Sequence, residues 1–153
     1  MMADIVKSSV IDSSVALKQQ LRDEDNTIEA DILLNDYAQG KIRLIVPSLF
    51  EYEVSNVLRT AVMKGRITET FAYAALSNLN NLLLAKYEFS SIQQIAMNIA
   101  FKYQRSVYDS AYLALAQSEG ISFVTGDRRL YNAVSHALPW VIWIGDYTLD
   151  ELT

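Results

Sequence analysis

Runs of apolar residues alternate with amphipathic stretches along the chain, and this pattern predicts strands alternating with helices. Short runs rich in apolar and aromatic residues are typical of buried strands, and they cover residues 9–11, 42–46, 86–90, 121–125 and 139–144. Stretches with apolar residues three and four positions apart are typical of helices, and they cover residues 13–21, 23–40, 48–65, 68–84, 91–104, 107–120 and 127–134. The second helix has an expected apolar stripe of Ile28, Ile32, Leu33 and Tyr37.

Short buried strands that are each followed by a helix form parallel sheets covered on both faces. We therefore expect an α/β fold, a three-layer α/β/α sandwich around a mostly parallel sheet of about five strands. The chain has 153 residues, and it contains no internal repeat and no linker rich in Gly, Pro or Ser. This length suits one domain, so we predict that residues 1–153 form a single domain.

Acidic residues follow two of the predicted strands. Asp12 comes directly after residues 9–11, and Asp127 follows residues 121–125. In open α/β sheets, ligands bind outside the carboxyl ends of the strands, so these two carboxylates lie where a ligand is expected. Glu53 shares a helical row with apolar residues and so points toward protein, and Asp109 lies in the first turn of a helix rich in Ala and Leu.

Each acid has a simpler interpretation when it is taken alone. Asp12, Asp109 and Asp127 could cap helices, and the carboxylate of Glu53 could reach solvent at the edge of its apolar stripe. Together the four carboxylates would repel strongly, since each pair at about 4 Å costs roughly 4 kcal/mol at an effective dielectric constant near 20. Such a cluster takes up protons or holds a divalent cation, and hard oxygen ligands suit Mg²⁺ or Mn²⁺.

Composition narrows the class of protein. Hydrophobic residues make up 51% and charged residues 20%, there is no cysteine, and no run approaches the length of a membrane span. The first residues lack the features of a signal peptide, so we predict a soluble cytoplasmic protein without a membrane partner. The net charge of −5 argues against a nucleic-acid partner, but residues 41–129 hold ten basic and seven acidic residues, which leaves room for a locally basic surface.

Four segments resemble the PIN-domain family, and in particular the VapC-type toxin ribonucleases of toxin–antitoxin pairs. These segments are VIDSSVALK (10–18), VPSLFEYEVSNVLR (46–59), YDSAYLALAQ (108–117) and FVTGDRRL (123–130). The acidic positions of the family match Asp12, Glu53, Asp109 and Asp127. Ser14 and Thr125 fall where the family carries small hydroxyl residues beside the acids.

The resemblance implies a metal-dependent endoribonuclease. The four matched acids would be the catalytic residues and would hold one or two Mg²⁺ or Mn²⁺ ions, with Ser14 and Thr125 in support. A metal-activated water would attack phosphorus and leave 5′-phosphate and 3′-hydroxyl ends. Arg128 and Arg129, directly after the fourth acid, are the best candidates for RNA-binding residues, although they could also be a solvated helical turn.

The resemblance also implies partners, and two other functions remain open. Relatives in the family pair with a small antitoxin protein and form homodimers, and residues 49–84 could supply such a surface or could only pack a helical core. One alternative is a catalytically inactive PIN-like module that binds RNA or protein. The other is a receiver-type phosphoacceptor domain, which would need a lysine near a late strand, whereas the last lysine is Lys102.

Overall fold

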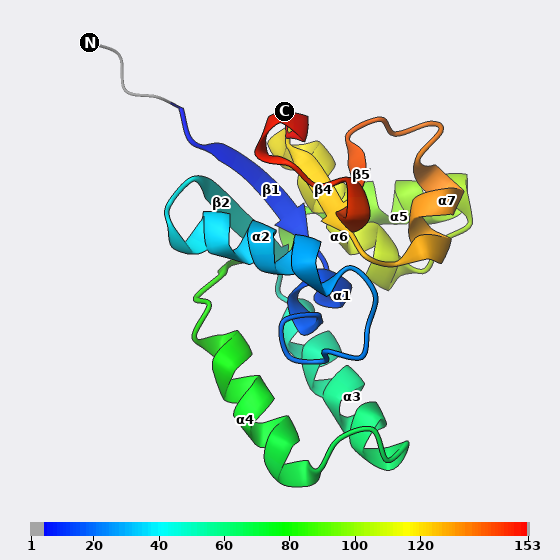
Figure 1. Cartoon of the computed structure of the whole chain (residues 1–153). Helices are drawn as coiled ribbons and strands as arrows, with labels where there is room; N and C mark the ends of the chain where they lie inside the picture. Colours follow the sequence, from blue (N-terminus) through cyan, green and yellow to red (C-terminus); the bar gives the residue numbers. More distant parts are fainter. Residues whose placement is uncertain (1–4, 153) are drawn as a thin grey trace.

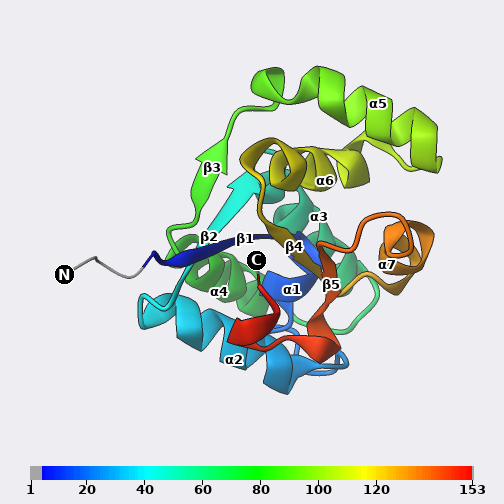
Figure 2. The ribbon, with the colours of Figure 1, turned by 90° about the horizontal axis from the view of Figure 1, so that it is seen from above.

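The central feature of the computed structural model, which describes residues 5–152, is a five-stranded sheet. Its strand order is β3-β2-β1-β4-β5, and every neighbouring pair is parallel. The strands are β1 (Lys7–Ile11), β2 (Ile42–Pro47), β3 (Ala85–Tyr87), β4 (Ser122–Thr125) and β5 (Val141–Trp143). The predicted α/β class and parallel sheet are confirmed (Figures 1 and 2).

Helices cover both faces of the sheet. They are α1 (Ser13–Leu17), α2 (Thr27–Ala38), α3 (Phe50–Met63), α4 (Glu69–Asn80), α5 (Gln93–Tyr103), α6 (Val107–Glu119) and α7 (Arg128–Val134). Helix α6 packs on the central strands and α5 packs on α6, whereas α1 and α2 cover the opposite face (Figure 2). Helices α3 and α4 form an antiparallel pair that extends away from the sheet (Figure 1).

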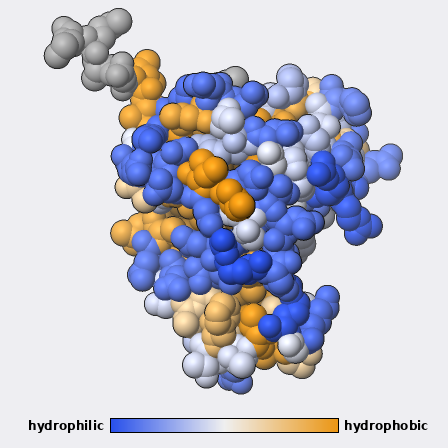
Figure 3. Space-filling model, viewed as in Figure 1, coloured by the Kyte–Doolittle hydropathy of each residue, from blue (hydrophilic) through white to orange (hydrophobic). Residues whose placement is uncertain are grey.

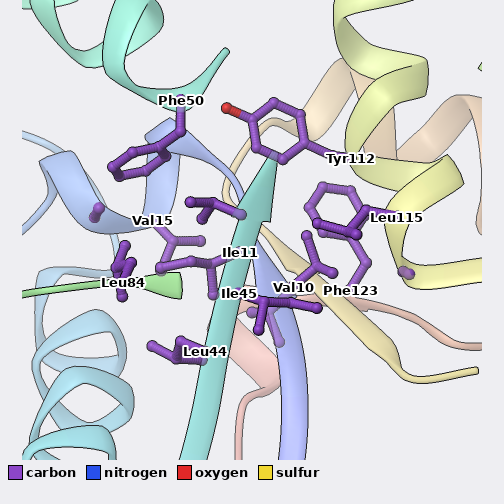
Figure 4. Close-up of a cluster of buried hydrophobic side chains, with 14 of the residues drawn as sticks. Val10, Ile11, Val15, Leu44, Ile45, Phe50, Leu84, Tyr112, Leu115 and Phe123 are labelled. Atoms are coloured by element: carbon purple, nitrogen blue, oxygen red, sulfur yellow. The ribbon is translucent and has the colours of Figure 1, made fainter. Parts of the chain in front are cut away.

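The core forms where the central strands meet α6. Val10 of β1 pairs with Ile45 of β2 on one side and with Phe123 of β4 on the other, and all three are buried. The ring of Tyr112, from α6, stacks on Phe123 with ring centres 6.0 Å apart and an angle of 13° between the planes. Figure 4 shows the Tyr112 hydroxyl leaving this apolar cluster on the side where Phe50 of α3 lies. The core therefore holds a polar atom at its edge, next to the start of α3.

Several predicted elements have other bounds in the structure. The helix expected over residues 13–21 ends at Leu17, and the chain turns so that Leu21 is buried after it. The strand expected over 86–90 covers Ala85–Tyr87 and gives way to a 3₁₀ helix at Phe89–Ser91, because its one neighbour β2 ends at Pro47, opposite Tyr87. The last strand starts at Val141, because Pro139 has no N–H for the ladder, and it ends at Trp143 where a 3₁₀ helix begins.

The expected apolar stripe of α2 is also wrong in part. Leu33 is buried, but Ile28 and Ile32 are 70% and 48% exposed. The buried face instead includes Ala30 and Leu34. Contact with β2 decides which side of this helix faces the protein, and the apolar pattern alone does not reveal that side.

Among residues 5–152, no helix combines the length and the apolar character that are needed to cross a bilayer. Two further 3₁₀ helices, at Ile144–Asp146 and Leu149–Glu151, follow β5 and bring the chain back along the sheet. Residues 1–4 and 153, which belong to the predicted single domain, lie outside the described residues.

Candidate active site

All four predicted acids come from elements that meet at the carboxyl edge of the sheet. Asp12 directly follows β1, and a single residue, Gly126, separates Asp127 from the end of β4. Glu53 lies in the first turn of α3 and Asp109 in the first turn of α6. Because β1 and β4 are parallel neighbours, their ends, and the helices that begin beside them, share one edge.

The capping interpretation holds for two of the acids. The Asp12 carboxylate accepts from the Val15 backbone N–H at 3.3 Å, and the Asp127 carboxylate accepts from the Arg129 and Leu130 N–H groups at 3.0 and 3.2 Å. Asp109 does not cap its helix, because the Ser106 hydroxyl takes that place. Capping uses only part of the hydrogen-bonding capacity of a carboxylate, so it does not exclude a second role for Asp12 and Asp127.

Asp12 is the most buried of the four acids, with 5% of its surface exposed. The Ser14 hydroxyl donates to its Oδ1, and the Thr125 hydroxyl donates to its Oδ2 at 2.5 Å. Burial raises the pKa of Asp12 to about 6, although these hydrogen bonds oppose the rise, and the charge of Asp127 raises the pKa further. The fold therefore holds a carboxylate where ionisation is costly.

Ser14 and Thr125 also tie β1 to the loop after β4. The Ser14 hydroxyl accepts from the Gly126 N–H at 2.9 Å, and the Thr125 hydroxyl accepts from the Asp127 N–H at 3.0 Å. Gly126 permits a close approach here, because a Cβ at this position would lie 2.7 Å from Cε of the buried Lys18. The two hydroxyl residues thus hold the first and last acids in one local network.

Glu53 is held by Tyr112. The Tyr112 hydroxyl donates to Glu53 Oε1 at 2.6 Å and also hydrogen-bonds the backbone of Ser13, next to Asp12. Burial raises the pKa of Tyr112, so the phenol stays protonated and remains a donor. Burial also raises the pKa of Glu53; the bond from Tyr112 opposes this rise, and the charges of Asp12 and Asp109 add to it.

Asp109 and Asp127 line an open polar hollow of about 370 Å³, together with Arg105, Ser106 and Arg129. Burial raises the pKa of Asp109, repulsion from Asp127 raises it further, and the positive charge of Arg105 lowers it. The hollow thus combines two carboxylates with two guanidinium groups. Such a mixture can bind a cation and a phosphate side by side.

The acids interact with one another around the site. Asp12 is within electrostatic range of Asp127 and Glu53, and Asp109 is within range of Glu53 and Asp127. Among residues 5–152, no three acidic or histidine side chains approach closely enough to form a ready-made metal cage. The donor set still fits a hard cation, because Mg²⁺ keeps several waters and is usually held by one or two carboxylates.

Sequence reasoning missed two residues of this site. Tyr112 lies three positions after Asp109, so helical spacing places both side chains on the same side of α6 and could have identified it. Arg105 directly precedes the Ser106 cap of α6, where Gln104 adopts a left-handed conformation with φ of 53°. A basic residue beside the cap of an acid-bearing helix was the available signal for Arg105.

The two predicted RNA-binding arginines are placed differently. Arg129 lines the polar hollow, whereas the Arg128 guanidinium lies over the ring of Trp143. Both side chains are exposed.

The sequence profile of the PIN domain matches residues 9–135 of the chain. The chain belongs to the PIN domain family. The matched range runs from β1 to just past α7, so it contains all four acids and both hydroxyl residues of the site. The resemblance read from the sequence is confirmed, and membership of the PIN domain family removes the basis for the receiver-type alternative.

Curated relatives of this PIN domain are named VapC ribonucleases. Ribonuclease VapC1 of Mycobacterium tuberculosis is 36% identical over 93 residues, which cover 61% of this chain and 68% of the relative. Ribonuclease VapC9 of the same organism is 31% identical over 106 residues, which cover 64% of this chain and 79% of the relative.

Solved structures share the PIN fold at lower identity. PAE2754 from Pyrobaculum aerophilum aligns with a TM-score of 0.67 and 20% identity, covering 91% of this chain and 85% of that one. VapBC2 from Rickettsia felis, bound to a DNA fragment from its promoter, aligns with a TM-score of 0.62 and 10% identity, covering 89% and 96%. A toxin–antitoxin complex from Klebsiella pneumoniae aligns with a TM-score of 0.56 and 17% identity, covering 88% and 95%. At these identities the likeness concerns the fold.

Proposed function

We propose that this PIN domain is a metal-dependent endoribonuclease and the toxin of a toxin–antitoxin pair. The observation that carries the proposal is the meeting of four acids from four elements at one edge of the sheet, where burial raises the pKa of Asp12, Glu53 and Asp109. Relatives named ribonucleases, at 31–36% identity, support RNA as the substrate. A fold that needed these acids only as caps would not have to place them within electrostatic range of one another.

Asp12, Glu53, Asp109 and Asp127 are the residues that would hold Mg²⁺ or Mn²⁺. The ion, when bound, offsets the negative charge of the site and of the scissile phosphate, and it lowers the pKa of a bound water. Tyr112 keeps Glu53 directed at the site, and Ser14 and Thr125 do the same for Asp12. These supporting side chains reduce the reorganisation that the reaction would otherwise require.

The arginines of the polar hollow give the phosphate a place to bind. Arg105 and Arg129 line the hollow beside Asp109 and Asp127, so a phosphodiester there would lie next to the acids. Water would attack phosphorus, and the bond to the 3′ oxygen would break, which leaves a 5′-phosphate and a 3′-hydroxyl. The attacking water must lose a proton, and carboxyl groups with raised pKa values are the bases that the site offers.

The α3–α4 pair supports the proposed protein partners, a small antitoxin and a second copy of the chain. Figure 3 shows apolar side chains gathered over the end of the molecule that these helices form. Leu58, Val62 and Ala72 line an open groove of about 340 Å³ there, beside the exposed Met63 and Tyr73. Apolar patches of this kind are typical of protein interfaces. One of the structural neighbours described above is a toxin–antitoxin complex, which favours an antitoxin as one partner.

The decisive experiment is RNA cleavage by the unmodified chain and by Asp12→Asn and Asp109→Asn, with Mg²⁺, with Mn²⁺ and with a chelator. Asp25→Asn is the matched control, because Asp25 is exposed. We expect cleavage by the unmodified chain and by the control only when a divalent ion is present, with products that carry 5′-phosphates, and loss of cleavage in the two site variants. Circular dichroism checks that all variants fold.

Equal cleavage by all four proteins, or cleavage that persists with the chelator, would refute the mechanism. RNA binding without cleavage under every metal condition would instead support the inactive PIN-like module.

A further inference from the structure

Arg128 and Arg129, which begin α7, have side chains with different surroundings. Arg129 lines the polar hollow, whereas the guanidinium carbon of Arg128 lies 3.8 Å from the ring centre of Trp143. This distance is close contact, so the guanidinium rests on the indole. Within the described part of the chain, Arg128 makes no ion pair, and its side chain is exposed. Its charge is therefore available to a ligand.

The indole beneath Arg128 is firmly held. Trp143 ends β5 and lies opposite Thr125 of β4 in the sheet. Gly145 leaves space for the indole, since a Cβ at that position would lie 2.6 Å from the indole Nε1. The ring of Tyr131, from α7, packs against the indole with ring centres 6.0 Å apart and a tilt of 54°. The indole is thus a fixed support for Arg128.

This support lies at the same edge of the sheet as the acids. Thr125, whose hydroxyl donates to Asp12, is the partner of Trp143 in the neighbouring strand, and neighbouring strands lie about 4.8 Å apart. Asp127 immediately precedes Arg128 in the chain. An RNA strand with a phosphate in the hollow would therefore bring an adjacent base within reach of Arg128.

We propose that Arg128, supported by Trp143, is a stacking platform for one unpaired base of a single-stranded RNA. The inference rests on the proposed RNA cleavage and adds a substrate preference to it. A guanidinium has two flat faces; the indole covers one, and the exposed face suits a nucleobase, because unpaired bases stack on arginine planes. A base inside a duplex is already stacked and paired, so the platform selects unpaired segments.

The test separates stacking from charge by replacing each arginine with lysine, which keeps the charge and removes the plane. Arg128→Lys and its matched control Arg129→Lys are made in the Asp12→Asn chain so that RNA stays intact during binding. The affinity of each protein for a short fluorescent single-stranded RNA is measured by titration. The titration is then repeated with a series of the same RNA in which each position in turn carries an abasic nucleotide.

We expect Arg128→Lys to weaken binding of the intact RNA by about tenfold, as for the loss of one stacked base. At one position of the RNA, loss of the base should weaken binding to the Asp12→Asn chain by a similar factor. With that abasic RNA, the Asp12→Asn chain and the same chain carrying Arg128→Lys should bind with equal affinity. The effect of Arg129→Lys should be the same for every abasic RNA, because this residue faces the phosphate hollow.

An Arg128→Lys effect that is the same for all abasic RNAs, or no effect at all, would overturn the platform while cleavage by the unmodified chain still supports the nuclease. If the unmodified chain does not cleave RNA and the Asp12→Asn chain does not bind it, the proposed function is wrong and the platform with it.

Discussion

Replacing Asp12 by asparagine should stabilise the protein in the absence of divalent ions. The Asp12 carboxyl is buried, and its pKa rises to about 6 in the folded protein from a model value of 3.8. A rise of this size destabilises the folded state by about 3 kcal/mol at pH values above 6. Asparagine has nearly the same shape and no charge, so the substitution removes this cost.

The pH dependence follows from the direction of the shift. Between about pH 4 and 6 the folded protein retains the Asp12 proton more strongly than the unfolded chain does, so the free energy of unfolding falls as pH rises through this window. Below this window the carboxyl is protonated in both states, so the charge no longer separates the variant from the parent and only their difference in hydrogen bonding remains. The gain should therefore develop between pH 4 and 6 and stay constant above pH 6.

Hydrogen bonding reduces the gain somewhat. The amide oxygen of asparagine can accept from Val15 N–H and from Ser14, as Oδ1 of Asp12 does. The amide nitrogen is a donor, so the Thr125 hydroxyl can no longer donate to this group and must turn. Losing one such bond costs about 1 kcal/mol, which leaves an expected gain of about 2 kcal/mol at pH 7.5, or a rise in Tm of roughly 5 °C.

Urea unfolding followed by circular dichroism, at pH 4 and pH 7.5 in the presence of a chelator, measures this gain. Asp25→Asn serves as the control, since an exposed substitution should change stability by less than about 0.5 kcal/mol. Adding Mg²⁺ should raise the stability of the parent more than that of Asp12→Asn. If Asp12→Asn were no more stable than the parent at pH 7.5, the claim that the fold holds this carboxylate at a cost would be wrong.

Two further substitutions test contacts around the site. Tyr112→Phe keeps the stack on Phe123 and removes the hydrogen bond to Glu53. Single-turnover RNA cleavage should therefore slow by about tenfold or more while the fold is retained. An unchanged rate would mean that this bond does not position Glu53. Gly126→Ala places a Cβ against Cε of Lys18 and should lower the free energy of unfolding, measured in urea, by roughly 1–2 kcal/mol. A smaller loss in a Lys18→Ala background would confirm the contact, and an equal loss would contradict it.

Local pattern was sufficient to predict the sheet and the position of the acids. The apolar runs at 42–46 and 121–125 correspond to β2 and β4 almost residue for residue, because buried parallel strands need continuous apolar side chains. Once the strands are parallel, their carboxyl ends share one edge, so acids that follow two strands must lie near each other. The convergence of Asp12 and Asp127 was therefore predictable from order along the chain.

The apolar pattern was insufficient where the end of a helix or its buried face depends on the elements that pack against it. The stretch 13–21 has the composition of a longer helix, but the chain leaves the helix after Leu17 and buries Leu21 by a turn. Ile28 and Ile32 have helical spacing, yet the face of α2 that contacts β2 is a different one. In both places, packing against the rest of the fold outweighs the helical preference of the local sequence.

The sequence by itself determined the class of fold, the order of its elements and the family to which the chain belongs, because periodicity and short motifs are local properties. Only the tertiary structure decided that Tyr112 bonds Glu53 across 59 residues and that Thr125 bonds Asp12 across 113. It also decided that Arg128 rests on Trp143 while Arg129 faces the acids. Hydrogen bonds and ring contacts need atoms within a few ångströms, and for residues far apart in the chain that closeness exists only after the sheet and its covering helices have formed.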